Sequence, residues 1–508
     1  MQDIAGILCG WVLCLLVFYL VYVKVIIVPS KKGALPRSYP FAGHLFSMLR
    51  HRNTILDWTA DLLRKSPTST FTLRFPFGRA RILTANPNNV QHIMKLRFKD
   101  YPKSRNFEDS FLDLFGESLF LADGENWKRQ RMLYGAEFHA KSFLTFIESI
   151  TLEELSERMF PLLSAAARGE KVLDFQEVMR RFTFDVVARL GLGHDLAYLS
   201  PSFPETEFGD AFDEAIEICW KRCLSPFMTA WRLQKLFDLG SEWRLRRAVA
   251  VLRRLIRKLI KERKEFGDDF LSRLMSKKIT DEKFLIDAAI AIVLGGVDTM
   301  VSAFTWLFWI VARHPEAEAK ILREIEDYDA GKIKELVYIH AAVAESMRLN
   351  PPVPLEGKQA RVDDVWPDGT RVQKGMGVIC HTYAVGRSAA VWGSDWAEFK
   401  PERWLKKEDG AGAGEERWSF AAKDAFTYPV FQAGPRICLG KDIAFIQLKM
   451  VAAAVLRRFR VVDAAANGGG LPLCESYISC RMKDGFSVRI VERGSMQQSP
   501  QIKNGGVA

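Results

Sequence analysis

The sequence has little cysteine and little histidine, with eight of each among 508 residues. The cysteines form no C-x-x-C pair and show no spacing typical of a zinc site. Cys219 and Cys223 lie one helical turn apart and are interpreted as two small apolar residues on one helix face. Neither a zinc cluster nor a disulfide framework is therefore predicted, and this cysteine usage is typical of a chain that faces the cytosol.

The chain also has no basic arm, because its lysines and arginines are spread along the sequence. The 72 Lys and Arg residues against 61 Asp and Glu give a net charge of +11. This pattern argues against a nucleic-acid partner and favours a basic face toward an acidic membrane surface or an acidic protein. Hydrophobic residues make up 48% of the chain and charged residues 26%, which excludes a disordered chain and a polytopic membrane protein.

One long run near the start of the chain has no charge at all. It extends over the twenty residues from Ile4 to Val23, a length that spans a bilayer as a helix. Basic residues follow it, so the positive-inside rule places the rest of the chain in the cytosol. Prolines and glycines come next and predict a stiff extended linker. The expected organisation is a membrane anchor at 1–28, a proline-rich hinge at 29–45, a globular domain at 46–495 and a flexible tail at 496–508.

A second long apolar run extends from Thr280 to the helix-stopping Pro315. Thr280 is expected to cap the helix that this run predicts. Two carboxylates inside it, Asp287 and Asp298, would each cost about 2.5–3.5 kcal/mol in a bilayer. We therefore expect a central core helix that protein surrounds, rather than a second membrane span.

Two adjacent glycines, Gly295 and Gly296, interrupt that helix in its middle. They let a flat group approach the backbone and let a helical hydrogen bond open. Asp298 and Thr299 follow them and would make a proton path beside such an opening. A kink caused only by packing explains the same residues, and this segment alone does not separate the two interpretations.

Two other pairs have the spacing of side chains that act together on one helix face. Glu345 and Arg348 are three residues apart among apolar neighbours, so a buried ion pair is expected. Such a pair needs a third partner, and Arg403 in FKPERW is the candidate. Trp127 and Arg131 are four residues apart, and their N–H groups would suit a carboxylate.

The stretch FQAGPRICLG places Cys438 directly before a predicted helix, where backbone N–H groups favour a thiolate. Gly434 and Gly440 leave room for a planar macrocycle, and Arg436 would meet a carboxylate at its edge. Phe431 would shield the sulfur. A disulfide or a zinc site lacks partners, and a nucleophile would want a positioned histidine. A haem thiolate ligand accounts for the most residues.

Taken together, these motifs resemble the cytochrome P450 family. Four elements match it in order: W-x-x-x-R at 127–131, G-G-x-D-T at 295–299, E-x-x-R at 345–348 followed by P-E-R-W, and F-x-x-G-x-R-x-C-x-G at 431–440. The resemblance covers nearly the whole chain. It implies a mainly α fold with a smaller β-rich part, one N-terminal transmembrane helix and a buried haem b.

The resemblance also implies roles for individual residues. Cys438 is expected to be the iron ligand, and Asp298 and Thr299 to deliver protons during oxygen activation. Glu345, Arg348 and Arg403 are expected to be structural. The residues that it places around the haem are Trp127, Arg131 and Arg436 at the propionates and Phe431, Gly434 and Gly440 in the loop. Electrons are expected from NADPH through a cytochrome P450 reductase that docks on a basic face.

In finer detail the chain resembles the plant clan that hydroxylates the ends of aliphatic chains. It departs from that clan at Val297, Met300 and Asn350 and in the segment 104–123. We expect oxygen insertion at or near a chain end of a lipid, either a long-chain fatty acid or a sterol side chain, such as C-26 of a hydroxylated cholesterol. Alternatives are oxidation of a jasmonate conjugate, a peroxide-rearranging haem-thiolate enzyme, and a non-catalytic haem protein.

The expected location is the endoplasmic reticulum membrane, with a single span and the catalytic domain in the cytosol. Seven apolar residues are candidates to face the substrate, although each also fits an ordinary core position. They are Phe111, Phe115, Phe120, Leu294, Val353, Leu355 and Ile478.

Overall fold

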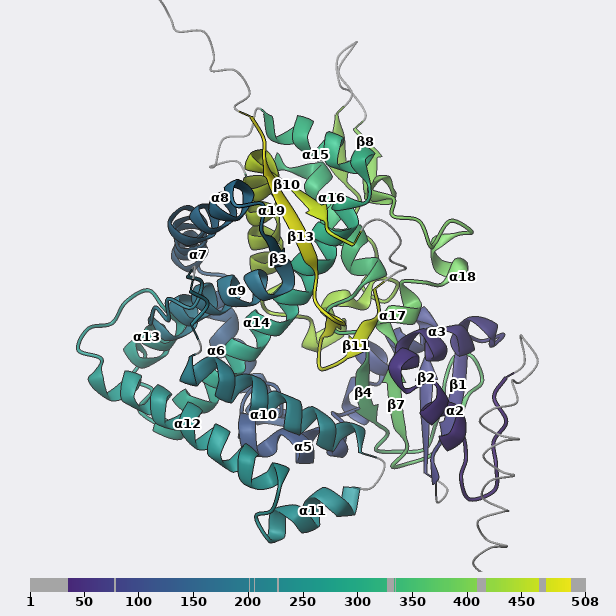
Figure 1. The fold of residues 1–508 in the computed structure, drawn as a ribbon. Helices are drawn as coiled ribbons and strands as arrows, with labels where there is room; N and C mark the ends of the chain where they lie inside the picture. Colours follow the sequence, from purple (N-terminus) through teal and green to yellow (C-terminus); the bar gives the residue numbers. More distant parts are fainter. Residues whose placement is uncertain are drawn as a thin grey trace, which may run out of the picture.

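The computed structural model describes residues 35–76, 79–200, 202–204, 206–225, 228–326, 333, 335–408, 417–465 and 472–494. The predicted membrane anchor, the first residues of the predicted hinge and the predicted tail lie outside the described residues. The described part is mainly helical with a smaller sheet part, as expected (Figure 1). Its helices are α2 (Leu45–Arg50), α3 (Ile55–Lys65), α4 (Pro87–Gln91), α5 (Arg105–Phe115), α6 (Gly124–Phe138), α7 (Lys141–Glu154), α8 (Phe160–Arg168), α9 (Phe175–Leu192), α10 (Glu207–Leu224), α11 (Met228–Leu236), α12 (Ser241–Glu262), α13 (Phe270–Ser276), α14 (Glu282–Ala312), α15 (Pro315–Glu326), α16 (Val337–Leu349), α17 (Thr382–Val385), α18 (Ala389–Trp392) and α19 (Lys441–Arg458).

The strands form several small sheets, of which the largest lies to one side of the helices in Figure 1. This sheet has the order β1-β2-β7-β4, and β2 and β7 pair in parallel. A second sheet has the order β10-β13-β3, and β11 and β12 form a hairpin. The strands are β1 (Thr70–Arg74), β2 (Ala80–Thr84), β3 (Val172–Asp174), β4 (Glu356–Gln359), β5 (Asp364–Val365), β6 (Arg371–Val372), β7 (Gly377–Cys380), β8 (Leu405–Lys407), β9 (Trp418–Phe420), β10 (Phe459–Asp463), β11 (Cys474–Ser476), β12 (Cys480–Met482) and β13 (Ser487–Glu492).

The central helix α14 lies among α9, α12, α16 and α19. Among the described residues it is the one helix long and apolar enough to cross a membrane, but 72% of its most apolar stretch is buried by protein. Its acid Asp287 is buried and pairs with Arg253 of α12 at 2.8 Å. The prediction of a core helix is confirmed. The expected cap was wrong, because Asp281, not Thr280, accepts the N–H of Phe284.

The glycine pair in α14 does not open the helix, which runs unbroken from Glu282 to Ala312. A Cβ at Gly296 would lie 2.8 Å from Val187 of α9, so close helix packing requires this glycine. Gly295 differs, because it is exposed although its helix is mostly buried. The expected break in the helix was therefore wrong, and the interpretation based on packing explains Gly296.

The buried carboxylate of Glu345 joins α16 to the segment that precedes the cysteine loop. Arg348 donates to Glu345 at 2.7 and 2.8 Å, and both side chains are fully buried. Arg403 donates to the same carboxylate at 3.2 Å. The Trp404 indole adds a bond at 2.9 Å, and the backbone N–H of Lys400 adds one at 3.0 Å. The expected third partner of the pair is thus present, and the carboxylate has its hydrogen-bonding capacity filled.

The described part of the proline-rich hinge differs from the expected extended linker. Residues 39–44 form a turn closed by a bridge between Tyr39 and Gly43. The backbone N–H of His44 donates to the carbonyl of Arg74, which docks this turn on β1. Gly43 has a φ of 57° and approaches the Arg74 carbonyl too closely for a side chain. The globular packing therefore begins before residue 46.

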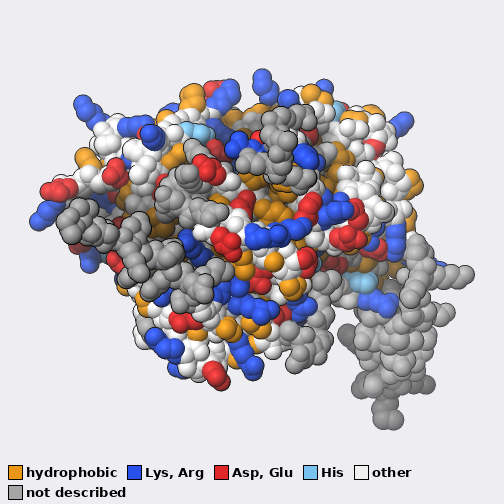
Figure 2. Space-filling model, turned by 90° about the horizontal axis from the view of Figure 1, so that it is seen from above, with side chains coloured by type: hydrophobic (Ala, Val, Ile, Leu, Met, Phe, Trp, Pro, Cys, Tyr) orange, Lys and Arg blue, Asp and Glu red, His pale blue; other side chains and the backbone are white. Residues whose placement is uncertain are grey.

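The face of the molecule drawn in Figure 2 carries mixed charge rather than a single basic stripe. Figure 2 shows Lys and Arg side chains interspersed with Asp and Glu over the face seen from above. This arrangement on that face agrees with the spread of basic residues along the sequence and does not resemble a continuous groove for a phosphate backbone.

We predict that Glu345→Gln lowers the free energy of unfolding by about 3–5 kcal/mol, because the fully buried guanidinium of Arg348 loses its counter-charge and the half-buried Arg403 keeps only Asp395. Urea unfolding followed by tryptophan fluorescence measures this loss. Glu402→Gln is the matched control, since Glu402 makes a half-exposed pair with Lys320 at 2.5 Å. The control is expected to cost at most about 1 kcal/mol. Equal losses in the two variants would contradict a structural role for Glu345.

Candidate functional site

Cys438 lies in a loop just before α19, whose N-cap is Gly440. Its backbone N–H donates to the carbonyl of Phe431 at 2.8 Å, which closes the loop. The side chain is exposed, yet burial raises the pKa of its thiol, while the Gly440 N–H and Arg131 oppose that change. The thiol is therefore accessible although protein surrounds it closely, as expected for a side chain that faces an interior hollow.

Three cations gather beside this loop. Arg436 donates to Asp123 at 2.9 Å and to the carbonyl of Ala122 at 3.1 Å, and its guanidinium lies 4.6 Å from the Trp127 ring. Arg131 comes from the same helix as Trp127 and has no ion pair among the described residues. Burial lowers the pKa of both arginines.

The third cation, Lys103, was missed by sequence reasoning because it stands in a loop without a motif. Burial holds the pKa of its ammonium well below the usual value, and Arg436 and Lys358 add repulsion. Its Nζ lies 3.4 Å from the carbonyl of Leu119. Two acids, Glu356 and Asp123, oppose that repulsion at Lys103. The N–H groups of Lys103, Arg131 and Arg436 are a donor set that suits carboxylates.

The two loop glycines differ in their surroundings. Gly434 has a φ of 66°, and a Cβ there would collide with the carbonyl of Met94. This glycine is therefore needed for a turn packed on the segment His92–Leu96, and its role beside a macrocycle stays a prediction. A Cβ at Gly440 would lie 3.9 Å from the Cys438 sulfur and 4.0 Å from Phe138, which is ordinary contact. Phe431 packs against Phe445 of α19, with ring centroids 5.3 Å apart.

The residues expected to move protons lie together on α14. The Thr299 hydroxyl donates to the carbonyl of Gly295 at 2.7 Å. Asp298 is buried and forms an ion pair with Arg481 of β12, a partner that no sequence spacing indicated. The same Arg481 nitrogen lies 3.6 Å from Asp213 of α10. Asp298 is thus not a solitary acid but one end of a charged network.

An apolar cluster adjoins this part of α14 and contains most of the substrate-facing candidates. Phe111 and Phe115 of α5 stack at 5.5 Å, and Phe120 follows at 5.8 Å from Phe115. A Cβ at Gly295 would lie 3.3 Å from Phe120, so this ring is the nearest side chain to the exposed glycine. Leu294 and Ile478 belong to the same cluster.

The other two candidates do not join that cluster. Leu355 packs with the cluster beside the β1-β2-β7-β4 sheet, and Val353 is half-buried near it in sequence. Leu355 is therefore part of the apolar cluster that packs beside the β1-β2-β7-β4 sheet.

One disulfide departs from the cysteine analysis. Cys474 and Cys480 are bonded and close the β11–β12 hairpin. Their spacing of six residues is no recognisable motif, so the sequence carried no signal for it. The other four described cysteines, Cys438 included, are free.

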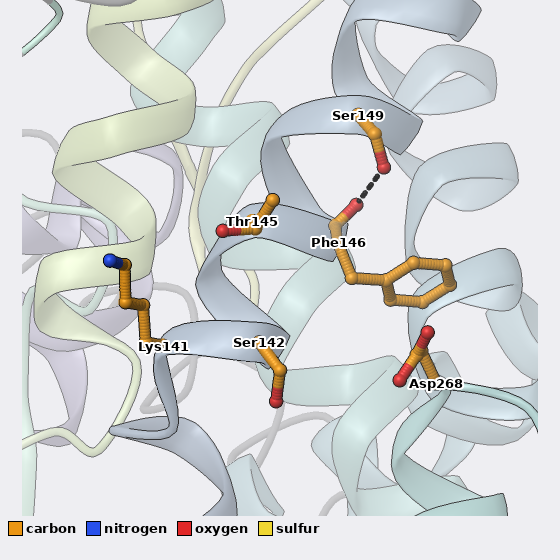
Figure 3. A pocket seen from close by; sticks show the side chains of 6 residues that line it. All are labelled: Lys141, Ser142, Thr145, Phe146, Ser149 and Asp268. Atoms are coloured by element: carbon orange, nitrogen blue, oxygen red, sulfur yellow. Dashed lines mark hydrogen bonds between the residues drawn. The ribbon is translucent and has the colours of Figure 1, made fainter.

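A separate hollow lies on the outer side of α7 and contains none of the predicted site residues (Figure 3). Its lining comes from α7 and from Asp268 before α13. The Ser149 hydroxyl donates to the Phe146 carbonyl at 2.8 Å within it, so that hydroxyl is already used by its own helix. The side chains that line this hollow do not form a recognisable catalytic or metal-binding group.

The residues of the Cys438 loop fit the haem that the resemblance implies. An accessible thiol lies inside the protein, and the cationic side chains of Lys103, Arg131 and Arg436 lie beside it. An exposed glycine, Gly295, occurs in the middle of α14. Cys438 would ligate the iron, Arg131, Arg436 and Trp127 would hold the propionates, and the thiolate would supply the electron density that favours O–O cleavage. Among the described residues, no group of three or more His, Cys, Asp or Glu could instead hold a metal ion.

Comparisons with known proteins agree with this geometry. The family model for Cytochrome P450 matches residues 34–474. Cytochrome P450 94A2 of Vicia sativa is 42% identical over 477 residues, which cover 91% of this chain and 92% of that protein. Cytochrome P450 94B1 of Arabidopsis thaliana is 38% identical, with 90% of this chain and 91% of that protein covered. The chain therefore belongs to the cytochrome P450 monooxygenase family, whose cofactor is a haem iron.

Proposed function

We propose that this monooxygenase inserts one oxygen atom from O2 into a C–H bond at or near the end of an aliphatic lipid chain. The observation that carries the proposal is the apolar cluster of Phe111, Phe115, Phe120 and Leu294 against Gly295. Phe111 and Phe115 are fully buried in this cluster, while Phe120 is half-buried and lies against the exposed Gly295. A methyl end without charge or hydrogen-bonding groups suits contact with this apolar surface, because a polar end would lose its hydration there. A long-chain fatty acid and a sterol side chain both present this kind of end.

Proton delivery by Asp298 and Thr299 is part of the proposal. A buried acid and a hydroxyl beside Gly295 can hold and pass protons, which a monooxygenase needs and a peroxide-rearranging enzyme does not. Their presence on α14 favours the first class over the second.

The proposed electron donor is an NADPH-dependent reductase. Support comes from α6, which buries Trp127 but exposes Lys128, Arg129 and Met132. Lys441 is exposed at the start of α19, close to Cys438 in the chain. A basic surface with one apolar residue suits an acidic protein partner.

The proposed location is the endoplasmic reticulum membrane, with the catalytic domain in the cytosol. Support comes from the uncharged N-terminal sequence and from exposed apolar residues around α11, which lies near the lower edge of the molecule in Figure 1. These residues are Leu224, Leu233, Leu236, Phe237 and Leu239. Such a patch, flanked by basic residues, is typical of contact with a lipid surface.

Product analysis tests the substrate class. Vesicles that hold the full chain, haem and a reductase are given NADPH with a long-chain fatty acid, a hydroxylated sterol or a jasmonate conjugate. We expect a hydroxyl at or next to the chain end of the fatty acid or of the sterol side chain. Oxidation confined to the jasmonate conjugate, or in mid-chain positions, would contradict the proposal.

We predict that Cys438→Ala abolishes the reduced-CO absorbance band typical of thiolate-ligated haem, because no other described cysteine lies in the loop. Cys380→Ala is the control, since Cys380 is a fully buried free cysteine whose thiol pKa is raised by burial to about 12. This control is expected to keep the band. A normal band in Cys438→Ala would end the assignment of the iron ligand.

We predict that Thr299→Ala raises the peroxide released per NADPH consumed, while Thr299→Ser largely restores coupling. Thr305→Ala is the matched control, because Thr305 makes the same type of bond, to the Val301 carbonyl at 2.7 Å, one and a half turns further along α14. Peroxide and NADPH are measured in the same vesicles. If both alanine variants release equal peroxide, the loss of a helix hydroxyl, and not of a proton carrier, explains the effect.

A further inference from the structure

Arg481 joins two acids that come from different helices. Its Nη2 atom forms an ion pair with Asp298 of α14 and lies 3.6 Å from Asp213 of α10. Asp213 in turn accepts from Arg180 of α9 at 2.8 Å. The side chains alternate in charge from Arg180 to Asp298, so the row is neutral as a whole.

The backbone on both sides of Arg481 is held by bonds to other elements. The carbonyl of Cys480 accepts from Ser302 and from Trp306 of α14, both at 2.8 Å. On the other side, Met482 exchanges two hydrogen bonds with the side chain of Gln176, at 2.8 and 3.0 Å. The backbone is therefore fixed on both sides of Arg481, which limits how far its guanidinium can move away from Asp298.

The pairing leaves one carboxylate oxygen of Asp298 unused. Asp298 is 1% exposed, and its Oδ2 atom has no hydrogen-bond partner among the described residues. A buried oxygen of this kind is normally bonded, most often to water. The guanidinium thus fixes one oxygen of the acid, and the other remains able to accept a proton.

Other ionisable groups also face this pair. The Tyr477 ring lies 4.3 Å from the Arg481 guanidinium, and burial raises the pKa of Tyr477. Glu177 of α9 pairs with Arg180 at 2.7 Å, and Glu217 of α10 acts on Tyr477. Burial also raises the pKa of Asp213, which Arg481 and Arg180 oppose. Arg481 is the cation that directly contacts Asp298.

We propose that Arg481 is a positioning residue for proton delivery, which holds one oxygen of Asp298 and presents its Oδ2 atom to water. The inference rests on the proposed monooxygenase function. In each cycle Asp298 accepts a proton from water on the solvent side and returns it to water on the Thr299 side, so that no charge accumulates. Without Arg481, the carboxylate would lose the contact that fixes its orientation, and Oδ2 would no longer be held in place for this exchange.

The test uses the full chain with haem and reductase in phosphatidylcholine vesicles, with lauric acid as the substrate. Peroxide released per NADPH is measured for wild type, Arg481→Met, Arg481→Lys and Asp298→Asn. Lys483→Met is the control, because Lys483 is an exposed cation two residues from Arg481. The laurate-induced spectral shift and thermal unfolding are recorded for each variant.

We expect Arg481→Met to raise the peroxide released per NADPH several-fold, because Oδ2 of Asp298 is no longer held in place. Arg481→Lys keeps the charge but not the guanidinium, so it should recover part of the coupling, and it serves if Arg481→Met does not fold. Lys483→Met should match wild type. Adding Arg481→Met to Asp298→Asn should change nothing further, because both substitutions act on the same step.

An unchanged peroxide yield in Arg481→Met together with lowered thermal stability would overturn the proposal and leave Arg481 as a structural brace. Additive effects in the double variant would overturn it as well. If wild type forms no hydroxylaurate, this result counts against the proposed substrate class alone, and the same variants are compared with whichever member of the substrate panel wild type does hydroxylate.

Discussion

The fold around the haem-binding loop depends on one buried carboxylate, that of Glu345. It accepts from Arg348 within its own helix and from Arg403 and Trp404 about sixty positions further along the chain. The fully buried guanidinium of Arg348 has no other ion pair among the described residues, so removal of Glu345 would leave a buried charge without a partner. Tyr428, directly before the loop, also bonds to α16 through the carbonyl of Ala344 at 3.1 Å. The cysteine loop thus begins from a segment whose position is set by a charge cluster rather than by a sheet.

The central helix α14 combines two requirements that usually conflict. It must be apolar enough to pack on nearly all sides, and it must carry acids and a hydroxyl where chemistry occurs. Asp287 and Asp298 are tolerated because each meets an arginine from another element, Arg253 and Arg481 respectively. Gly296 allows the helix to approach α9 closely, while Gly295 remains exposed under Phe120. The two glycines therefore have separate tasks, one in packing and one at the site.

Local spacing allowed much of this arrangement to be predicted from the sequence. Cys438 before α19, the Glu345–Arg348 pair and the core position of α14 all depend on residues within a few turns of one helix. The details that the sequence did not indicate depend on long-range approach. Gly434 is required because the distant Met94 backbone lies against it, and Asp298 is held by a residue 183 positions away. No periodicity carries such information, since it arises only when the hairpin β11–β12 packs on α14.

Under the proposed function, that packing links substrate contact to proton supply. The hairpin carries Ile478, which joins the apolar cluster, and Arg481, which holds Asp298, only three residues apart. Asp213 of α10 completes the link, because its helix also contributes to the apolar cluster. A lipid that shifts the hairpin or α10 would change the distance between Arg481 and its two acids. A substitution in this hairpin chosen to fit a different lipid would therefore also alter coupling, so substrate preference and efficient use of NADPH are constrained together.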